Sequence, residues 1–166
     1  MQHNPKIISY ARAQQIAKRL HKEGKKIVFK TGCFDVVHIG HIRALEYCKG
    51  LGDVFILAIG SDKTLHALKG PDRPIFPEEL RAEVIAALAC VDYVLILKEP
   101  LRGRIDHEKI ISLIRPHYYM LPPDDKALQV KRIMAKKYGV TIKLKPETKG
   151  KYISTSQLIS RILAIG

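Results

Sequence analysis

The sequence predicts an α/β protein built on a Rossmann-like, doubly wound parallel sheet of about five strands. Short, nearly continuous apolar runs recur along the chain, which is typical of strands that are covered on both faces. Segments with apolar residues at helical spacing separate these runs, and such alternation favours a parallel sheet. The 166 residues are enough for one such domain, so we expect residues 1–166 to form a single domain.

The first expected element is a helix with Ser9 as its N-cap and Gly24 at its end. Its apolar residues share one face, so we expect the N-terminal segment, residues 1–25, to pack on the rest of the domain. Strands are expected at residues 26–31, 54–59, 93–97, 117–121 and 140–144. One helix is expected to begin at His41, and a short one to contain Leu65 and Leu68. Further helices are expected at residues 78–89, 108–114 and 124–138, and a last one after a Ser154 cap. In the 78–89 helix, the residues expected to face inward are Leu80, Val84, Ala87 and Leu88.

The first expected strand leads into the run TGCFDVVHIGH at residues 31–41. Gly32 lets the backbone approach a ligand, and free N–H groups at the start of the next helix attract anions. His38 and His41 flank Gly40 at that helix start, where imidazoles can donate hydrogen bonds to phosphoryl oxygens. The run therefore predicts a phosphate site, and the alternative is a structural turn with two solvated or capping histidines.

The pattern GCFD followed by HIGH resembles the GxFD…HxGH signature of the cytidylyltransferase-like nucleotidyltransferases. From about residue 8 to residue 97, the chain is most similar to the adenylyltransferase domain of ADP-heptose synthases. The resemblance implies the HxGH nucleotidyltransferase fold, with His38 and His41 as catalytic residues. It implies nucleotide or phosphate contacts for Thr31, Gly32, Cys33, Phe34 and Gly40. The residues alone favour structural roles for Phe34, as a core aromatic, and for Asp35, as a turn-capping carboxylate.

The segment ISTS at residues 153–156 precedes the last expected helix. By itself it is an ordinary helix N-cap. However, it resembles the C-terminal ISTT or ISSS motif of the same family. That likeness implies phosphate contacts from Ser154, Thr155 and Ser156.

The segment between residues 69 and 77 is rich in Pro and Gly and contains two cations. Its RPI run at residues 73–75, with a later arginine, resembles the RPI…ER segment of the heptose-phosphate adenylyltransferases. The likeness implies that Lys69, Arg73 and Arg81 supply a basic lid over the phosphates. A solvated loop is the alternative.

The chain departs from the ADP-heptose synthases after the strand expected at 117–121. Those enzymes usually carry a Gly-Gly-Asp turn that approaches the nucleotide, whereas here Pro122 and Pro123 precede Asp124 and Asp125. Proline removes a backbone donor and stiffens the turn, so the same contact cannot be made. The two aspartates are expected to start a helix rather than to bind metal.

Composition limits the partners that the chain can bind. A net charge of +13 fits an anionic ligand, and the scattering of the basic residues disfavours nucleic acid. No apolar run is long enough to cross a membrane, and the first residues lack the apolar core of a secretory signal, so we expect a cytoplasmic protein. The 3 cysteines lack CxxC spacing, which argues against a disulfide framework or a zinc site.

The resemblance implies transfer of a nucleoside monophosphate from a triphosphate, with ATP favoured, to a sugar phosphate such as heptose 1-phosphate. Pyrophosphate is released, and Mg²⁺ accompanies the triphosphate; no protein metal site is expected. The nearest alternative is a cytidylyltransferase acting on glycerol 3-phosphate or another alcohol phosphate. A non-catalytic nucleotide or nucleic-acid binding module is an alternative of another class. Class I aminoacyl-tRNA synthetases share the HIGH motif, but this chain has no KMSKS-type loop. Dimers are common in the family, so a homodimer is a further expectation.

Overall fold

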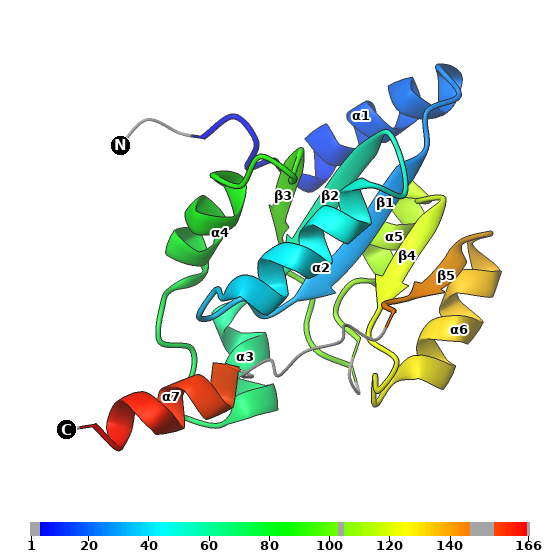
Figure 1. Ribbon diagram of the computed structural model, residues 1–166. Helices are drawn as coiled ribbons and strands as arrows, with labels where there is room; N and C mark the ends of the chain where they lie inside the picture. The colour runs from blue at the N-terminus through cyan, green and yellow to red at the C-terminus, as the bar shows by residue number, and fades with distance from the viewer. Residues whose placement is uncertain (1–3, 103–104, 147–154, 166) are drawn as a thin grey trace.

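The computed structural model describes residues 4–102, 105–146 and 155–165, and within them five strands form one sheet (Figure 1). The strands are β1 (Ile27–Gly32), β2 (Val54–Ile59), β3 (Tyr93–Ile96), β4 (Tyr118–Leu121) and β5 (Thr141–Leu144). Their order is β3-β2-β1-β4-β5, and every neighbouring pair is parallel. The order of the strands switches at β1, which places helices on both faces of the sheet. The structure thus confirms the doubly wound α/β class that the sequence predicts.

Two hydrophobic clusters cover the two faces of the sheet. The helices are α1 (Tyr10–Lys22), α2 (Ile39–Lys49), α3 (Asp62–Lys69), α4 (Glu78–Ala86), α5 (Glu108–Ile114), α6 (Leu128–Lys137) and α7 (Thr155–Leu163). Buried side chains of α1, α5 and α6 join Phe29 in one cluster, whereas those of α2 and α4 join Val28 in the other. Successive residues of a strand point to opposite faces, so Thr31 belongs to the Phe29 side and Lys30 to the Val28 side.

Helix α1 follows the sequence pattern closely. The Ser9 side chain accepts a hydrogen bond from the Arg12 N–H at 3.2 Å, which confirms the predicted N-cap. The apolar residues that share a face of this helix are Ala13, Ile16, Ala17 and Leu20. All four are buried, and they pack in the same cluster as the buried side chains of α5. Helix α1 therefore packs on the sheet through its buried side chains.

Helix α4 presents a different face from the one expected. Leu80 and Val84, expected to face inward, are 43% and 51% exposed, and Ala87 is exposed as well, so the expectation is wrong for all three. The buried face instead carries Arg81, Ala82, Ile85 and Ala86. Small alanine side chains let this helix lie close to the sheet, and the arginine is tolerated because its nitrogens find hydrogen-bond partners.

The ends of two later helices also differ from expectation. Helix α6 begins at Leu128 rather than at residue 124, because the two prolines lead into a turn in which Asp125 accepts a hydrogen bond from the Ala127 N–H at 2.8 Å. Helix α7 begins at Thr155 and has no buried residue; its expected cap, Ser154, lies outside the described residues. Among the helices that the structure describes, none has the length and apolar character needed to cross a membrane.

Candidate active site

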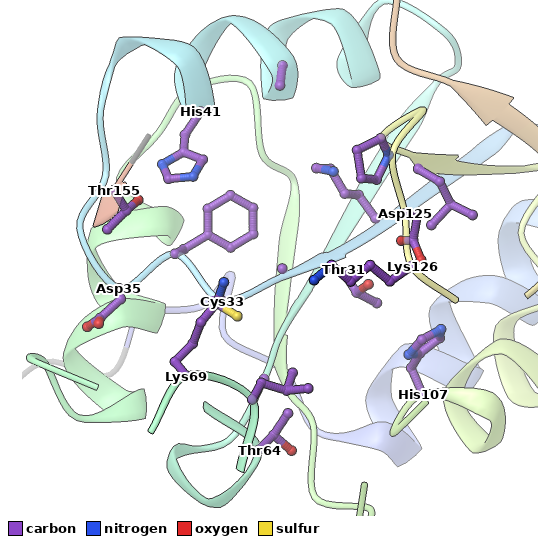
Figure 2. Close-up of a pocket in the computed structure, with 18 of the residues that line it drawn as sticks. Thr31, Cys33, Asp35, His41, Thr64, Lys69, His107, Asp125, Lys126 and Thr155 are labelled. Atoms are coloured by element: carbon purple, nitrogen blue, oxygen red, sulfur yellow. The ribbon is translucent and has the colours of Figure 1, made fainter. Parts of the chain in front are cut away.

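A cleft of about 890 Å³ lies along the carboxyl edge of the sheet (Figure 2). Parallel strands end together at this edge, which is where open α/β sheets bind ligands. The ends of β1, β2 and β4, the start of α2 and the start of α7 all contribute to its wall. The predicted site residues that line it are Thr31, Gly32, Cys33, Phe34, His38, Gly40, His41, Lys69, Arg73, Thr155 and Ser156.

The turn from β1 into α2 is built around Phe34. This residue has a φ of 48°, in the left-handed region, and its ring is buried. A Cβ atom on Gly32 would lie 2.4 Å from Cε2 of that ring, so only glycine fits there. The ring also meets the imidazole of His41 edge-on, with centroids 5.1 Å apart. Phe34 is thus a core aromatic, as its residue type predicts, and it supports the histidine.

His38 and His41 are stacked at the start of α2, with ring centroids 3.9 Å apart. His38 is the N-cap of the helix, and its Nδ1 accepts a hydrogen bond from the Gly40 N–H at 3.1 Å. In the neutral ring the proton therefore lies on Nε2, which can donate to a ligand. Burial, together with His38, Lys30 and Lys145, lowers the pKa of His41 to about 4. Burial and Lys145 also lower the pKa of His38. Both rings are thus neutral rather than fixed charges. His38 offers its Nε2 proton, whereas the His41 ring makes a hydrogen bond with the Val36 backbone, and its Nδ1 is buried without a partner among the described residues.

Two lysines supply positive charge beside these histidines. Lys30 lines the cleft from β1, and burial lowers its pKa, with Lys131 and Lys145 acting in the same direction. Lys145 follows β5 and lines the same cleft. Lys30 is not among the site residues that the sequence predicts. A charged residue that alternates with buried Val28 near the end of a strand is the signal that could have identified it.

The loop at residues 70–77 is attached to the β1–α2 turn by Asp35. The buried carboxylate of Asp35 accepts hydrogen bonds from Arg73 Nε, from the Ile75 N–H at 2.8 Å and from the Phe76 N–H at 3.2 Å. Asp35 therefore caps a turn, as its residue type predicts, but the turn is in a distant segment. The contact also holds the Arg73 side chain, which is 15% exposed, at the wall of the cleft.

Arg81 is buried under the loop before α4 and does not face the cleft, as a cation that closes over the phosphates would. Its side chain is 1% exposed, and it is not among the residues that line the cleft. Its nitrogens donate to the carbonyls of Phe76, Cys33 and Gly60 and to Asp62 Oδ1, at 2.6 to 2.9 Å. The expected role in the lid is therefore replaced by a structural one, because Arg81 joins the loop before α4 to the ends of β1 and β2.

The C-terminal motif is described in part. Thr155 and Ser156 line the cleft, while Ser154 lies outside the described residues. Thr155 Oγ1 donates a hydrogen bond to the Val36 carbonyl at 3.4 Å. The start of α7 is thereby held against the loop that leads to His38, at the wall of the cleft.

A second group of polar side chains lines the part of the cleft nearest α5. His107 Nε2 lies 2.7 Å from the Tyr119 hydroxyl, and its Nδ1 lies 3.1 Å from Asp106 Oδ1. The Tyr119 hydroxyl lies 3.3 Å from Thr31 Oγ1. An ion pair between Lys131 and Asp125 and the side chains of Asp106 and His107 line the same region. The sequence does not predict this group, because it comes from separate segments of the chain and forms no motif.

Comparison with known proteins agrees with this arrangement. Residues 29–161 match the family model described as cytidylyltransferase-like. The chain is 36% identical to the bifunctional protein HldE of a Nitratiruptor species, over 94% of this chain and 32% of that protein. It is also 36% identical to HldE of Aliarcobacter butzleri, over 96% of this chain and 31% of that protein. The chain therefore spans about a third of the length of these relatives.

Solved structures show the same fold. The lipopolysaccharide core biosynthesis protein from Thermoplasma volcanium superposes with a TM-score of 0.62 at 28% identity, over 77% of this chain and 100% of that one. Pantoate-beta-alanine ligase from Francisella tularensis has a TM-score of 0.61 at 17% identity, over 87% of this chain and 67% of that one, and this likeness concerns the fold alone. With the family match and the two histidines at the start of α2, the chain belongs to the cytidylyltransferase-like family and is an enzyme of the nucleotidyltransferase type.

Proposed function

We propose that the protein transfers a nucleoside monophosphate from a nucleoside triphosphate, with ATP favoured, to a sugar phosphate such as heptose 1-phosphate. Pyrophosphate is the second product. The similarity to the HldE proteins and to a lipopolysaccharide core biosynthesis protein supports a sugar-phosphate acceptor. CTP with glycerol 3-phosphate, or with another alcohol phosphate, is the alternative pair of substrates.

The observation that carries the proposal is the stacked pair of neutral histidines beside two lysines in one cleft. A triphosphate carries several negative charges, and Lys30 and Lys145 would offset part of them. The Nε2 proton of His38 can donate to a phosphoryl oxygen, and the helix dipole favours an anion at the start of α2. Donors fixed in this way stabilise charge that develops during the reaction without having to reorganise.

In the proposed reaction, a phosphate oxygen of the acceptor attacks the α-phosphorus of the triphosphate. A new oxygen–phosphorus bond forms as the bond from the α-phosphorus to the bridging oxygen breaks, and pyrophosphate leaves with that oxygen. No covalent intermediate with the protein is required, because positioning and charge neutralisation lower the barrier. We assign His38 and His41 to the transferring phosphoryl group, and Arg73, Lys69, Thr155 and Ser156 to the outgoing phosphates.

Mg²⁺ would accompany the triphosphate. The part of the chain that the structure describes has no group of three or more His, Cys, Asp or Glu side chains that could hold a metal ion. Magnesium at nucleotide sites is usually held by substrate phosphates with one or two carboxylates, so a preformed cage is not needed. The donor set therefore fits an ion that arrives on the phosphate oxygens, where it would neutralise part of their charge.

The turn after β4 leaves the identity of the nucleotide base to experiment. Pro122 lines the cleft at the end of this strand, and it has no backbone N–H with which to contact a base. The base must therefore be read by other groups than those of a glycine turn. For this reason the choice between ATP and CTP belongs in the test of function.

The test is pyrophosphate release from ATP, CTP, GTP or UTP with Mg²⁺, each combined with heptose 1-phosphate, glycerol 3-phosphate or another sugar phosphate. We expect release with one pair. The His41→Ala variant should lose about 10²- to 10³-fold in kcat, because the preorganised ring that stacks on His38 at the start of α2 is removed. His66→Ala, at an exposed histidine on α3, is the matched control. Near-normal turnover by His41→Ala would refute the assigned role, and silence for every pair would refute the proposed reaction.

A further inference from the structure

The cleft has two halves of different character. Figure 2 shows His41 and His107 far apart in the cleft, with Thr31 between them. The half near His41 contains Lys30 and Lys145 and so attracts phosphate. The half near His107 is lined by Asp106, Asp124 and Asp125, and also by Lys126 and by Lys131, which pairs with Asp125. The three carboxylates outnumber the two lysines, so a substrate with one charged end and one neutral end would place its neutral end here.

The hydrogen bonds in the His107 half have a definite direction. Burial lowers the pKa of His107 and raises the pKa of the Tyr119 hydroxyl, so both groups are uncharged at neutral pH. The neutral imidazole carries one proton, which goes from Nδ1 to Asp106 Oδ1, because a carboxylate oxygen only accepts. His107 Nε2 then accepts from the Tyr119 hydroxyl, and the Tyr119 oxygen accepts from the Thr31 hydroxyl.

This direction leaves acceptors, rather than donors, for a ligand. Asp106 is 7% exposed, and its Oδ2 is buried without a hydrogen-bond partner in the described part of the chain. Thr31 Oγ1 gives its proton to Tyr119 and keeps lone pairs that can accept. A buried carboxylate oxygen without a partner is costly, and native proteins rarely leave one unused. Asp106 lines the cleft, so a ligand there can supply the missing donor.

We infer that the His107 half of the cleft binds the hydroxyl-bearing carbon chain of the acceptor, with Asp106 Oδ2 and Thr31 Oγ1 each accepting a hydrogen bond from one of its hydroxyls. This inference rests on the proposed function, and it specifies the acceptor as a polyol or sugar phosphate. The ion pair of Lys131 and Asp125, at 2.8 Å, adds a donor and an acceptor to the same wall. Several polar groups of both kinds fit a ligand with several hydroxyls better than a base with one amino group.

The aromatic side chains support the same assignment. Nucleobases bind by stacking as well as by hydrogen bonds. The cleft is lined by one aromatic residue of the Phe, Tyr or Trp type among those described, Phe34, and its ring contacts His41 in the other half. No Phe, Tyr or Trp ring of the described residues therefore lines the cleft beside Asp106 for a base to stack on, whereas a carbon chain needs none.

The test is binding of heptose 1-phosphate and glycerol 3-phosphate, measured by calorimetry with the protein saturated by α,β-methylene ATP and Mg²⁺. The Asp106→Asn variant has nearly the same shape, but it replaces an acceptor by an amide. We expect the Kd of at least one of these hydroxylated phosphates to rise about 10- to 100-fold, as for loss of a hydrogen bond to a charged group. The Kd of α,β-methylene ATP and that of methyl phosphate, which lacks hydroxyls, should stay the same. Glu108→Gln is the matched control, because this exposed carboxylate pairs with Lys137 and Tyr138 instead.

Each outcome decides the inference separately from the proposed function. If the Kd of the hydroxylated phosphates is unchanged in Asp106→Asn, the inference is overturned. A higher Kd for the triphosphate analogue in this variant would also overturn it, because that result would assign Asp106 to the nucleotide. Failure of wild type to bind any of these hydroxylated phosphates would also overturn it. If wild type releases no pyrophosphate but Asp106→Asn still weakens sugar-phosphate binding, the inference stands and the proposed reaction fails. If Asp106→Asn does not fold, Tyr119→Phe is measured in its place, and the Kd of the hydroxylated phosphates is again expected to rise.

Discussion

The contact between Asp35 and the 70–77 loop makes the Asp35→Asn variant informative. Asparagine has nearly the same shape, and its oxygen can still accept from the Ile75 and Phe76 N–H groups. Its amide nitrogen, however, would face Arg73 Nε, so one donor would meet another and the ion pair would be lost. The variant therefore tests the ion pair while it preserves the two backbone hydrogen bonds.

The expected loss of stability follows from burial of both partners. The Asp35 side chain is 1% exposed and the Arg73 side chain is 15% exposed. Removing one partner of a buried pair costs about 3–5 kcal/mol, because the other charge is left without compensation. Asparagine keeps two of the three hydrogen bonds, so we expect the lower end, about 3 kcal/mol. For a chain of this size that corresponds to a fall in Tm of about 6–12 °C.

Urea unfolding followed by circular dichroism measures this loss. Glu99→Gln is the matched control, because Glu99 also pairs with a cation, Lys109, at 3.0 Å, but on the surface. Exposed pairs contribute about 1 kcal/mol or less. If Asp35→Asn lowers the free energy of unfolding by no more than Glu99→Gln does, the attachment of the loop through a buried ion pair is refuted.

Two further predictions concern buried groups near the cleft. Arg81→Met should lower the free energy of unfolding by about 3–5 kcal/mol, because three carbonyls and Asp62 lose their hydrogen-bond donor. Urea unfolding measures this loss. A higher Kd for the triphosphate with unchanged stability would show instead that Arg81 binds phosphate. His41 has a pKa of about 4 in the folded protein, below the usual 6.5, so the unfolded chain binds more protons between these values and stability should fall as the pH drops from 6.5 to 4. His41→Gln should flatten this part of the curve in urea unfolding at each pH, and an unaltered slope would contradict burial of the neutral ring.

Local patterns were sufficient for most of the fold. The apolar face of α1 and its Ser9 cap are present in the structure as predicted, because periodicity and capping depend on residues close together in the chain. The strands lie near their predicted places for the same reason. The ends of the helices were harder: α6 starts at Leu128, four residues after the predicted position, because a turn with its own hydrogen bonds follows the prolines.

The face of α4 shows where local pattern misleads. Leu80 and Val84 are the larger apolar residues, and by composition they should be buried. The structure buries Arg81 because its partners are carbonyls at the ends of β1 and β2, which no property of the helix sequence reveals. A charged residue enters a core only when distant groups satisfy it, so its burial is decided by tertiary structure.

The candidate site also has one part that the local sequence predicts and one part that only the tertiary structure decides. The histidines, the glycine turn and Phe34 lie within a few residues of one another, so the sequence alone was enough to predict them and the phosphate chemistry that they favour. The array of Thr31, Tyr119, His107 and Asp106 comes from three separate segments, and only the sheet order, with β4 beside β1, brings them together. Hydrogen bonds between side chains far apart in sequence produce no periodic pattern in the sequence. For this reason only the tertiary structure shows the His107 half of the cleft.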